Sequence, residues 1–260
     1  VHLTDVAGAR LTVFFADQCH TQIADARQNA WGLGGADHGR WLVWCGLTFP
    51  AHADWSTVLE LIDHPSVANE HKLGAMGLLA RHADELPPAV VEQLRQSVAV
   101  QPDQLTGVAT IETPERLQEA ATSLGLSLGV LDTRAVLARV SRWLRGGTAQ
   151  RLSAARLSAL AHRRSNDMLL QGMLLTLASD PHYRIRAVAA AALTRTLTRP
   201  TNPACEEAVL AAANDAGCHT PHAVASTLSG TCANEGLRQQ LEDILTRHPS
   251  ARVRAAVRSL

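Results

Sequence analysis

The residues of this chain that could do chemistry are mostly arginines, and several of them recur at regular intervals. One lysine accompanies 23 arginines, and five segments repeat a basic residue, an aliphatic residue and a short run containing alanine; they begin at Lys72, Arg116, Arg151, Arg184 and Arg252. A cation at the start of a helix is slightly unfavourable in the field of the helix dipole. The recurrence therefore needs another cause. Either the four arginines meet solvent and bind an acidic partner, or they are inherited from a duplicated repeat.

Positive charge is concentrated in the middle of the chain. Residues 133–205 contain 12 arginines against two acidic residues, whereas residues 1–132 carry a net charge of −9 and the whole chain is neutral. The candidates for a binding surface in this segment, besides the recurring arginines, are Arg139, Arg142, Arg145 and Trp143. A basic groove would bind a phosphate backbone or an acidic protein. Solvated helix faces, or attraction between the two halves of the chain, are the alternatives.

Two motifs resemble catalytic or metal sites but lack the required context. The segment from Gly125 to Gly129 matches the GxSxG nucleophile elbow, which needs a strand before the serine and a helix after it. A turn between two helices is the expectation here. Cys218, His219 and His222 are one ligand short of a zinc site. We therefore expect no catalytic residues, no metal and no cofactor.

Composition points to closely packed helices without a membrane span. Hydrophobic residues make up 46% of the chain and aromatic residues only 3%, so the core is built from alanine, leucine and valine. No apolar run approaches the length of a membrane-spanning helix. The five cysteines form no CxxC pair, which favours free thiols in a reducing cytoplasm. The chain does not begin with methionine, from which we expect it to be part of a longer protein.

Apolar residues follow helical spacing along most of the chain, and the fold class is predicted to be all-α. The basic-aliphatic segments recur with a period in the mid-thirties, typical of stacked helical hairpins, and the step from Arg184 to Arg252 spans two periods. Proline after a capping residue marks helix starts at Pro114, Pro181, Pro203 and Pro221. The predicted helix pairs are 55–63 with 67–83, 89–100 with 114–124, 133–145 with 149–163, 166–178 with 181–197, 203–215 with 221–229, and 237–246 with 249–260. Residues 101–112 form the longest irregular stretch.

The segment from Asp180 to Leu193 resembles the second helix of a HEAT repeat. It has an aspartate in the turn, an Ile-Arg pair at Ile185 and Arg186, and an alanine-rich helix ending in leucine. A similar segment surrounds Arg254, with His248 in place of the aspartate. The resemblance covers about residues 55–260. It implies an α-solenoid, a superhelix of about six stacked antiparallel hairpins whose second helices line the concave side. It also implies that Arg186 and Arg254 pair with turn aspartates of neighbouring repeats.

Residues 1–54 fit the repeat less well. Helical spacing is predicted for residues 5–16 and 21–30, followed by a glycine-rich stretch at 32–39, so an irregular cap or atypical first repeat is expected. Trp31, Trp41, Trp44 and Trp55 cluster in or next to this segment. They either pack in the core of the cap or form an exposed patch for another domain.

The sequence thus predicts a HEAT-repeat scaffold or adaptor that binds another protein through its second helices. The alternative is nucleic-acid binding along residues 134–199, with DNA glycosylase activity as a minor variant, because a group of HEAT-like alkylpurine DNA glycosylases has a basic concave face. Their catalytic aspartate has no residue-by-residue match in this chain.

Overall fold

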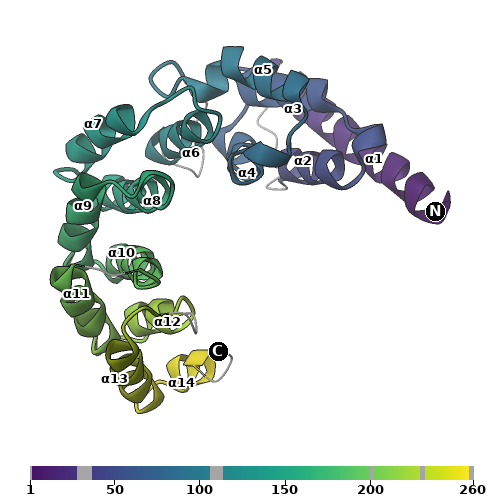
Figure 1. Cartoon of the computed structure of the whole chain (residues 1–260). Helices are drawn as coiled ribbons and strands as arrows, with labels where there is room; N and C mark the ends of the chain where they lie inside the picture. The colour runs from purple at the N-terminus through teal and green to yellow at the C-terminus, as the bar shows by residue number, and fades with distance from the viewer. Residues whose placement is uncertain (1, 28–36, 106–113, 200–201, 229–231, 258–260) are drawn as a thin grey trace. The chain divides into compact units, whose positions relative to one another are not determined.

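A computed structural model describes residues 2–27, 37–105, 114–199, 202–228 and 232–257 (Figure 1). Within these ranges the chain forms fourteen α-helices, three short 3-10 helices and no β-strand, which confirms the all-α class. The α-helices are α1 (His2–Arg27), α2 (His38–Thr48), α3 (Trp55–Asp63), α4 (Asn69–Arg81), α5 (Pro88–Gln96), α6 (Pro114–Ser127), α7 (Thr133–Trp143), α8 (Thr148–Ser165), α9 (Met168–Ala178), α10 (Tyr183–Thr196), α11 (Pro203–Ala213), α12 (His219–Ala225), α13 (Glu235–Thr246) and α14 (Ala251–Val257). The 3-10 helices are Pro50–His52, Ala83–Glu85 and Val98–Val100.

The chain divides into two compact units, residues 1–132 and 133–260. In the N-terminal unit α2 contacts α4, and α4 contacts α6, while α1 and α3 pack beside this row. Its core joins Cys19 and Ile23 of α1 to Leu61 of α3 and Leu79 of α4. Helices α1 and α2 therefore share one apolar core with the helices that follow them.

The C-terminal unit consists of two rows of helices. One row contains α8, α10, α12 and α14, each in contact with the next. The second row contains α7, α9, α11 and α13 and packs along one side of the first (Figure 1). The buried residues of α8 and α10 include Ala154, Ala155, Ala189 and Ala190. Because alanine has a small side chain, the backbones of these second helices can approach closely. The larger buried side chains, such as Leu174 of α9, fill the space between the rows.

Several helices begin after a side chain that caps the helix, and one of these starts was predicted from its capping residue. The Asn202 side chain accepts a hydrogen bond from the Ala204 N–H, and α11 begins at Pro203 as expected. Asp54 and Asp167 cap α3 and α9 in the same way. Two predicted starts are wrong. Helix α10 begins at Tyr183 instead of Pro181, and α12 begins at His219 instead of Pro221.

The helix α10 starts late because the residues before it form a structured turn. The Asp180 carboxylate accepts a hydrogen bond from the His182 N–H at 2.8 Å and one from the Arg151 guanidinium at 2.7 Å. The Arg186 guanidinium donates to the Asp180 and Pro181 carbonyls at 3.0 and 2.9 Å. It also donates to the Asp215 carboxylate of the next turn at 2.9 Å. Arg151 likewise donates to the Gly146 carbonyl of its own turn and to the Asp180 carboxylate of the next. We call an arginine that binds two consecutive turns in this way an arginine rung.

The same geometry recurs at the last turn with a different residue. His248 Nδ1 accepts a hydrogen bond from the Ser250 N–H, as Asp180 does from His182, and Arg254 donates to the His248 and Pro249 carbonyls at 2.7 Å. Since Nδ1 accepts, the proton of a neutral ring is on Nε2, which lies 3.3 Å from the Asp215 carbonyl. His248 thus takes the place of the turn aspartate, and its Nε2–H donates a hydrogen bond to the preceding turn at Asp215.

These turns correct the predicted register of the repeats. Asp215 accepts from the Gly217 N–H, so it corresponds to Asp180 in the preceding turn and to His248 in the following one. Pro181 and Pro221, which were both predicted as helix starts, are therefore not at equivalent positions. Pro221 occupies the position of Arg186, and the rung arginine is lost there while the period is maintained.

The N-terminal residues also differ from expectation. Helix α1 is continuous from His2 to Arg27, whereas two helices separated near residue 18 were predicted. Trp41 and Trp44 lie on α2 with exposed side chains. Their rings are arranged edge to face, with 6.2 Å between the ring centroids. Trp31, most of the glycine-rich stretch 32–39, and residues 106–112 of the predicted irregular stretch lie outside the described residues.

Lys72 is fully buried in α4. Its ammonium group donates to the His64 carbonyl at 2.5 Å, and burial lowers the pKa of Lys72 to about 8 although the charge of Asp63 acts to raise it. A buried ammonium loses hydration that a carbonyl only partly replaces. The first of the predicted basic residues is therefore a core residue.

Removing the charge of a rung should destabilise the C-terminal unit. In Asp180→Asn the partly buried Arg151 loses its anionic partner, so we expect the free energy of unfolding to fall by about 1–3 kcal/mol, between the values for exposed and buried ion pairs. Urea denaturation followed by circular dichroism measures this. The exposed Glu207→Gln serves as the control and should change stability by less than about 0.5 kcal/mol. Equal stability of the two variants would contradict a structural role for the rung.

The buried lysine should make stability depend on alkaline pH. An unfolded lysine has a pKa of about 10.4, so between about pH 8 and pH 10 the folded state binds fewer protons and the contribution of Lys72 to stability rises with pH. Between pH 7 and pH 10 the wild type should therefore gain up to about 3 kcal/mol in unfolding free energy relative to Lys72→Met. Cysteine titration occurs in both proteins and cancels in this difference. A difference that is constant with pH would show that Lys72 is not desolvated.

Candidate functional site

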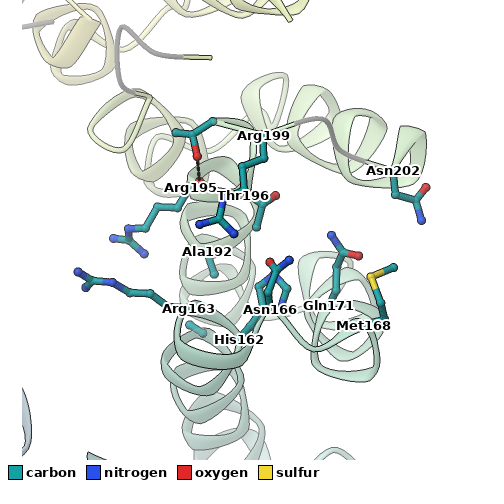
Figure 2. Close-up of a pocket in the computed structure, with 12 residues that line it drawn as sticks. His162, Arg163, Asn166, Met168, Gln171, Ala192, Arg195, Thr196, Arg199 and Asn202 are labelled. Atoms are coloured by element: carbon teal, nitrogen blue, oxygen red, sulfur yellow. Dashed lines mark hydrogen bonds between the residues drawn. The ribbon is translucent and has the colours of Figure 1, made fainter. Parts of the chain in front are cut away.

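A pocket of about 450 Å³ lies at one end of the helices in the C-terminal unit (Figure 2). It is bounded by the end of α8, the start of α9, the end of α10 and the start of α11. Its charged and polar lining comprises His162, Arg163, Asn166, Gln171, Arg195, Thr196, Thr198, Arg199 and Asn202. Three arginines and one histidine thus surround a single cavity.

The first wall of the pocket depends on the tight link between α8 and α9. Asn166 ends α8 in the left-handed conformation, with φ of 54°, which asparagine tolerates better than most residues. Asp167 follows at once and caps α9 by accepting from the Leu169 N–H at 2.8 Å. The buried His162 ring bonds the Asp167 carbonyl through Nδ1 at 3.0 Å, which holds this link against α8.

The second wall is the end of α10. Arg195 lies in the last turn of the helix, and the Thr198 hydroxyl donates to the Arg195 carbonyl at 3.2 Å (Figure 2). Arg199 follows one turn later. Cations in the last turn of a helix are favoured by the helix dipole, so part of this enrichment has a purely structural cause.

The helix dipole does not explain why these arginines lack carboxylate partners within the described ranges. In the described part of the chain, no salt bridge joins Arg163, Arg195 or Arg199 to a carboxylate. Burial and the like charge of Arg163 lower the pKa of Arg195, although arginine stays protonated near neutral pH. Positive charge is thus gathered here without an ion pair among the described residues, which is the arrangement of an anion-binding site.

Apolar side chains are exposed beside the pocket. Met168, which lines it, has 63% of its surface exposed, and its neighbour Leu169 has 66%. Both belong to the first turn of α9. Exposed apolar side chains next to arginines are typical of protein-binding surfaces, which are enriched in methionine and arginine.

Two of the predicted binding residues are buried. Arg139 is 8% exposed and Trp143 4%, and they lie on the same face of α7 as the buried Val136 and Val140. The Arg139 guanidinium lies over the Trp143 ring, 5.6 Å from its centroid. The spacing of these four residues is that of an apolar helix face, so the sequence already contained the signal that Arg139 packs inward. Both residues are excluded from an accessible surface.

The other predicted arginines have different surroundings. Arg151 forms the rung with Asp180, so its expected exposure to solvent at a helix start is wrong. Arg184 is exposed and stacks on Tyr183, with its guanidinium 5.8 Å from the ring centroid. Arg142, Arg145 and Arg252 are exposed in the C-terminal unit, and Arg116 is exposed in the N-terminal unit. Of the eight predicted binding residues, five are therefore exposed.

The predicted basic segment contained Arg163, Arg195 and Arg199, but the candidates for a binding surface did not include them. Arg163 and Arg195 are separated by close to one repeat period, and each lies in the last turn of a second helix. That spacing was the available signal. The recurring basic segments that indicated the repeat lie at the starts of these helices and not at their ends.

The motifs set aside as catalytic or metal sites are not assembled in the described residues. Ser127 is the last residue of α6 and is buried, so it does not occupy a strand-to-helix elbow. His219 packs against Tyr183 with ring centroids 4.5 Å apart. No group of three potential metal-ligating side chains occurs in the part of the chain that the structure describes. The same residues include no helix long and apolar enough to cross a membrane.

Comparisons with protein-family models, curated proteins and solved structures gave no match to this chain.

Arg139 should act as a core residue. Its truncation in Arg139→Ala removes the packing of its side chain and the cation–π contact with Trp143, so we expect a loss of about 1–3 kcal/mol in unfolding free energy. The exposed Arg142→Ala on the same helix is the matched control and should change stability by less than about 0.5 kcal/mol. Thermal and urea denaturation measure both. Equal unfolding free energies for the two variants would show that the Arg139 side chain does not pack against Trp143.

Proposed function

We propose that this protein is a non-catalytic, HEAT-like α-solenoid of about six helical hairpins that binds another protein. The two rows of helices and the equivalent turns at Asp180, Asp215 and His248 support the repeat architecture. The arginine rungs support it further, since each joins consecutive turns. Such arrays offer extended surfaces for binding, and the free cysteines favour a reducing compartment such as the cytoplasm.

The observation that carries the proposal is the exposed pair Met168 and Leu169 beside arginines without salt bridges in the described residues. We call this surface the α8–α11 rim and define it by Arg163, Met168, Leu169, Arg195 and Arg199. An apolar pair gains free energy when a partner covers it, at about 25 cal/mol per Å² of buried apolar surface. The surrounding arginines would select a partner that carries negative charge.

Nucleic-acid binding is the second candidate, and the net charge of +10 over residues 133–205 favours it. Three of the arginines in this segment have structural contacts, however: Arg139 is buried, while Arg151 and Arg186 bind turn carboxylates. Fewer cations are then available for a phosphate backbone, and the exposed Met168 and Leu169 have no counterpart in one. A protein partner accounts for both the charge and the apolar pair.

Partner capture tests the proposal. The wild-type chain and the double variant Met168→Glu/Leu169→Glu are immobilised and incubated with cell extract, with and without nuclease treatment, and the bound proteins are quantified by mass spectrometry. Because the new carboxylates oppose burial of the rim, we expect the variant to lose at least about 90% of the specifically bound protein, equivalent to about 1.4 kcal/mol or more.

Val6→Glu/Val13→Glu is the matched control, since it places the same charges at exposed valines of α1. It should retain the wild-type set of partners. Equal loss in both variants, or binding that disappears on nuclease treatment of the extract, would contradict a protein-binding rim. Circular dichroism confirms that each variant is folded.

A further inference from the structure

The pocket of the α8–α11 rim has three features that a generic basic surface lacks. It is a cavity of about 450 Å³, which is large enough for a small anionic group with its attached atoms. Arg163, Arg195 and Arg199 reach it from the ends of two successive second helices. The amide side chains of Asn166 and Gln171 also line it and offer neutral hydrogen-bond donors.

His162 adds a buried, unpaired polar atom to the residues that line the pocket. Its side chain is 4% exposed, and its Nδ1 must donate to Asp167 because a carbonyl oxygen can only accept. Its Nε2 is buried and has no hydrogen-bond partner among the described residues. An unpaired buried polar atom costs about 1–3 kcal/mol, so a ligand that displaces the side chains covering Nε2 and bonds it would recover part of this free energy.

The charges limit the chemistry of that ligand. A carboxylate has one negative charge and is satisfied by a single guanidinium through two parallel hydrogen bonds. A phosphate monoester has a charge of about −1.5 to −2 near neutral pH and three acceptor oxygens, so it can engage several guanidinium groups at once. It can also bond Nε2 in either protonation state of the ring, by donating from a P–OH group or by accepting from an imidazolium N–H. Three arginines that have no carboxylate partner in the described chain match the phosphate better.

We infer that the pocket lined by His162, Arg163, Arg195 and Arg199 binds a phosphate monoester group. This inference rests on the proposed function, because the group belongs either to a phosphorylated side chain of the partner protein or to a small free phosphate compound. In the first case the exposed Met168 and Leu169 contact the peptide on either side of the phosphorylated residue. In the second case the pocket binds the phosphate compound without help from these two side chains.

Binding of inorganic phosphate to the whole chain tests the pocket. Isothermal titration calorimetry in a chloride buffer should show one saturable site for the wild type. Arg195→Gln should weaken the affinity at least about 10-fold. His162→Asn should weaken it about 3-fold or more, since the asparagine amide can still donate to the Asp167 carbonyl while Nε2 is removed.

Arg247→Gln is the control, because Arg247 is exposed in the same unit and does not line the pocket. Its phosphate affinity should stay within about 2-fold of the wild type. No saturable binding up to about 10 mM phosphate would overturn the inference. So would an equal loss of affinity in Arg195→Gln and Arg247→Gln, which would indicate nonspecific charge attraction.

Two peptides of otherwise neutral sequence identify the source of the phosphate. A phosphoserine peptide that binds at least about 10-fold more tightly than inorganic phosphate supports a phosphorylated partner. Equal affinities support a small free phosphate compound. A glutamate peptide that binds as tightly as the phosphoserine peptide would overturn the phosphate assignment in favour of a carboxylate. Duplex DNA that binds more tightly than either peptide, and with equal sensitivity to Arg195→Gln and Arg247→Gln, would overturn it in favour of a nucleic-acid surface.

The inference and the proposed function can fail separately. Saturable phosphate binding that is sensitive to Arg195→Gln, together with partner capture insensitive to the glutamates at Met168 and Leu169, would refute only the protein-binding rim. Partner capture that is lost with those glutamates, in a protein that binds no phosphate, would refute only the phosphate pocket.

Discussion

The C-terminal unit depends on one interaction, the arginine rung between consecutive turns. Arg186 donates to the carbonyls of its own turn and to the carboxylate of Asp215 in the next, and Arg151 makes the corresponding bond to Asp180. Helices that pack through alanine and leucine can slide along one another at little cost in buried area, because such contacts are not directional. Hydrogen bonds between a charged guanidinium and a carboxylate are directional, so the rung fixes the register that the apolar core leaves undetermined.

This constraint also divides the arginines by role. Arginines at the starts of second helices, such as Arg151 and Arg186, bind turns and are half-buried, and Arg139 packs in the interior. Arginines at the ends of those helices, Arg163 and Arg195, have no carboxylate to bind in the described residues and surround a cavity. The same residue type therefore serves architecture at one end of a helix and forms an anion site at the other. The difference arises because aspartate occurs in the turns before α10 and α12, whereas the carboxylate of Asp167 caps the backbone of α9.

The accuracy of sequence-based prediction varied with the physical origin of each signal. The start of α11 at Pro203 and its cap at Asn202 were predictable because capping is a local interaction between near neighbours in the chain. The burial of Arg139 was also predictable from the spacing of the buried residues of α7, although a charged side chain is usually exposed. The equivalence of His248 with Asp180 was suggested by the resemblance between the two segments. That Asp215 corresponds to both became clear only from the hydrogen bonds, because Pro221 replaces the arginine that would have marked its repeat.

The sequence by itself was sufficient to predict the all-α class that the described residues show and the basic middle segment, because helical spacing, capping and charge are properties of residues close together in the chain. Only the tertiary structure decided which arginines are bound and which surround the pocket. Arg163 and Arg195 are separated by a whole hairpin, and their side chains line one cavity only because α8 and α10 pack side by side. The unpaired Nε2 of His162 likewise depends on burial by distant residues, which no local pattern specifies.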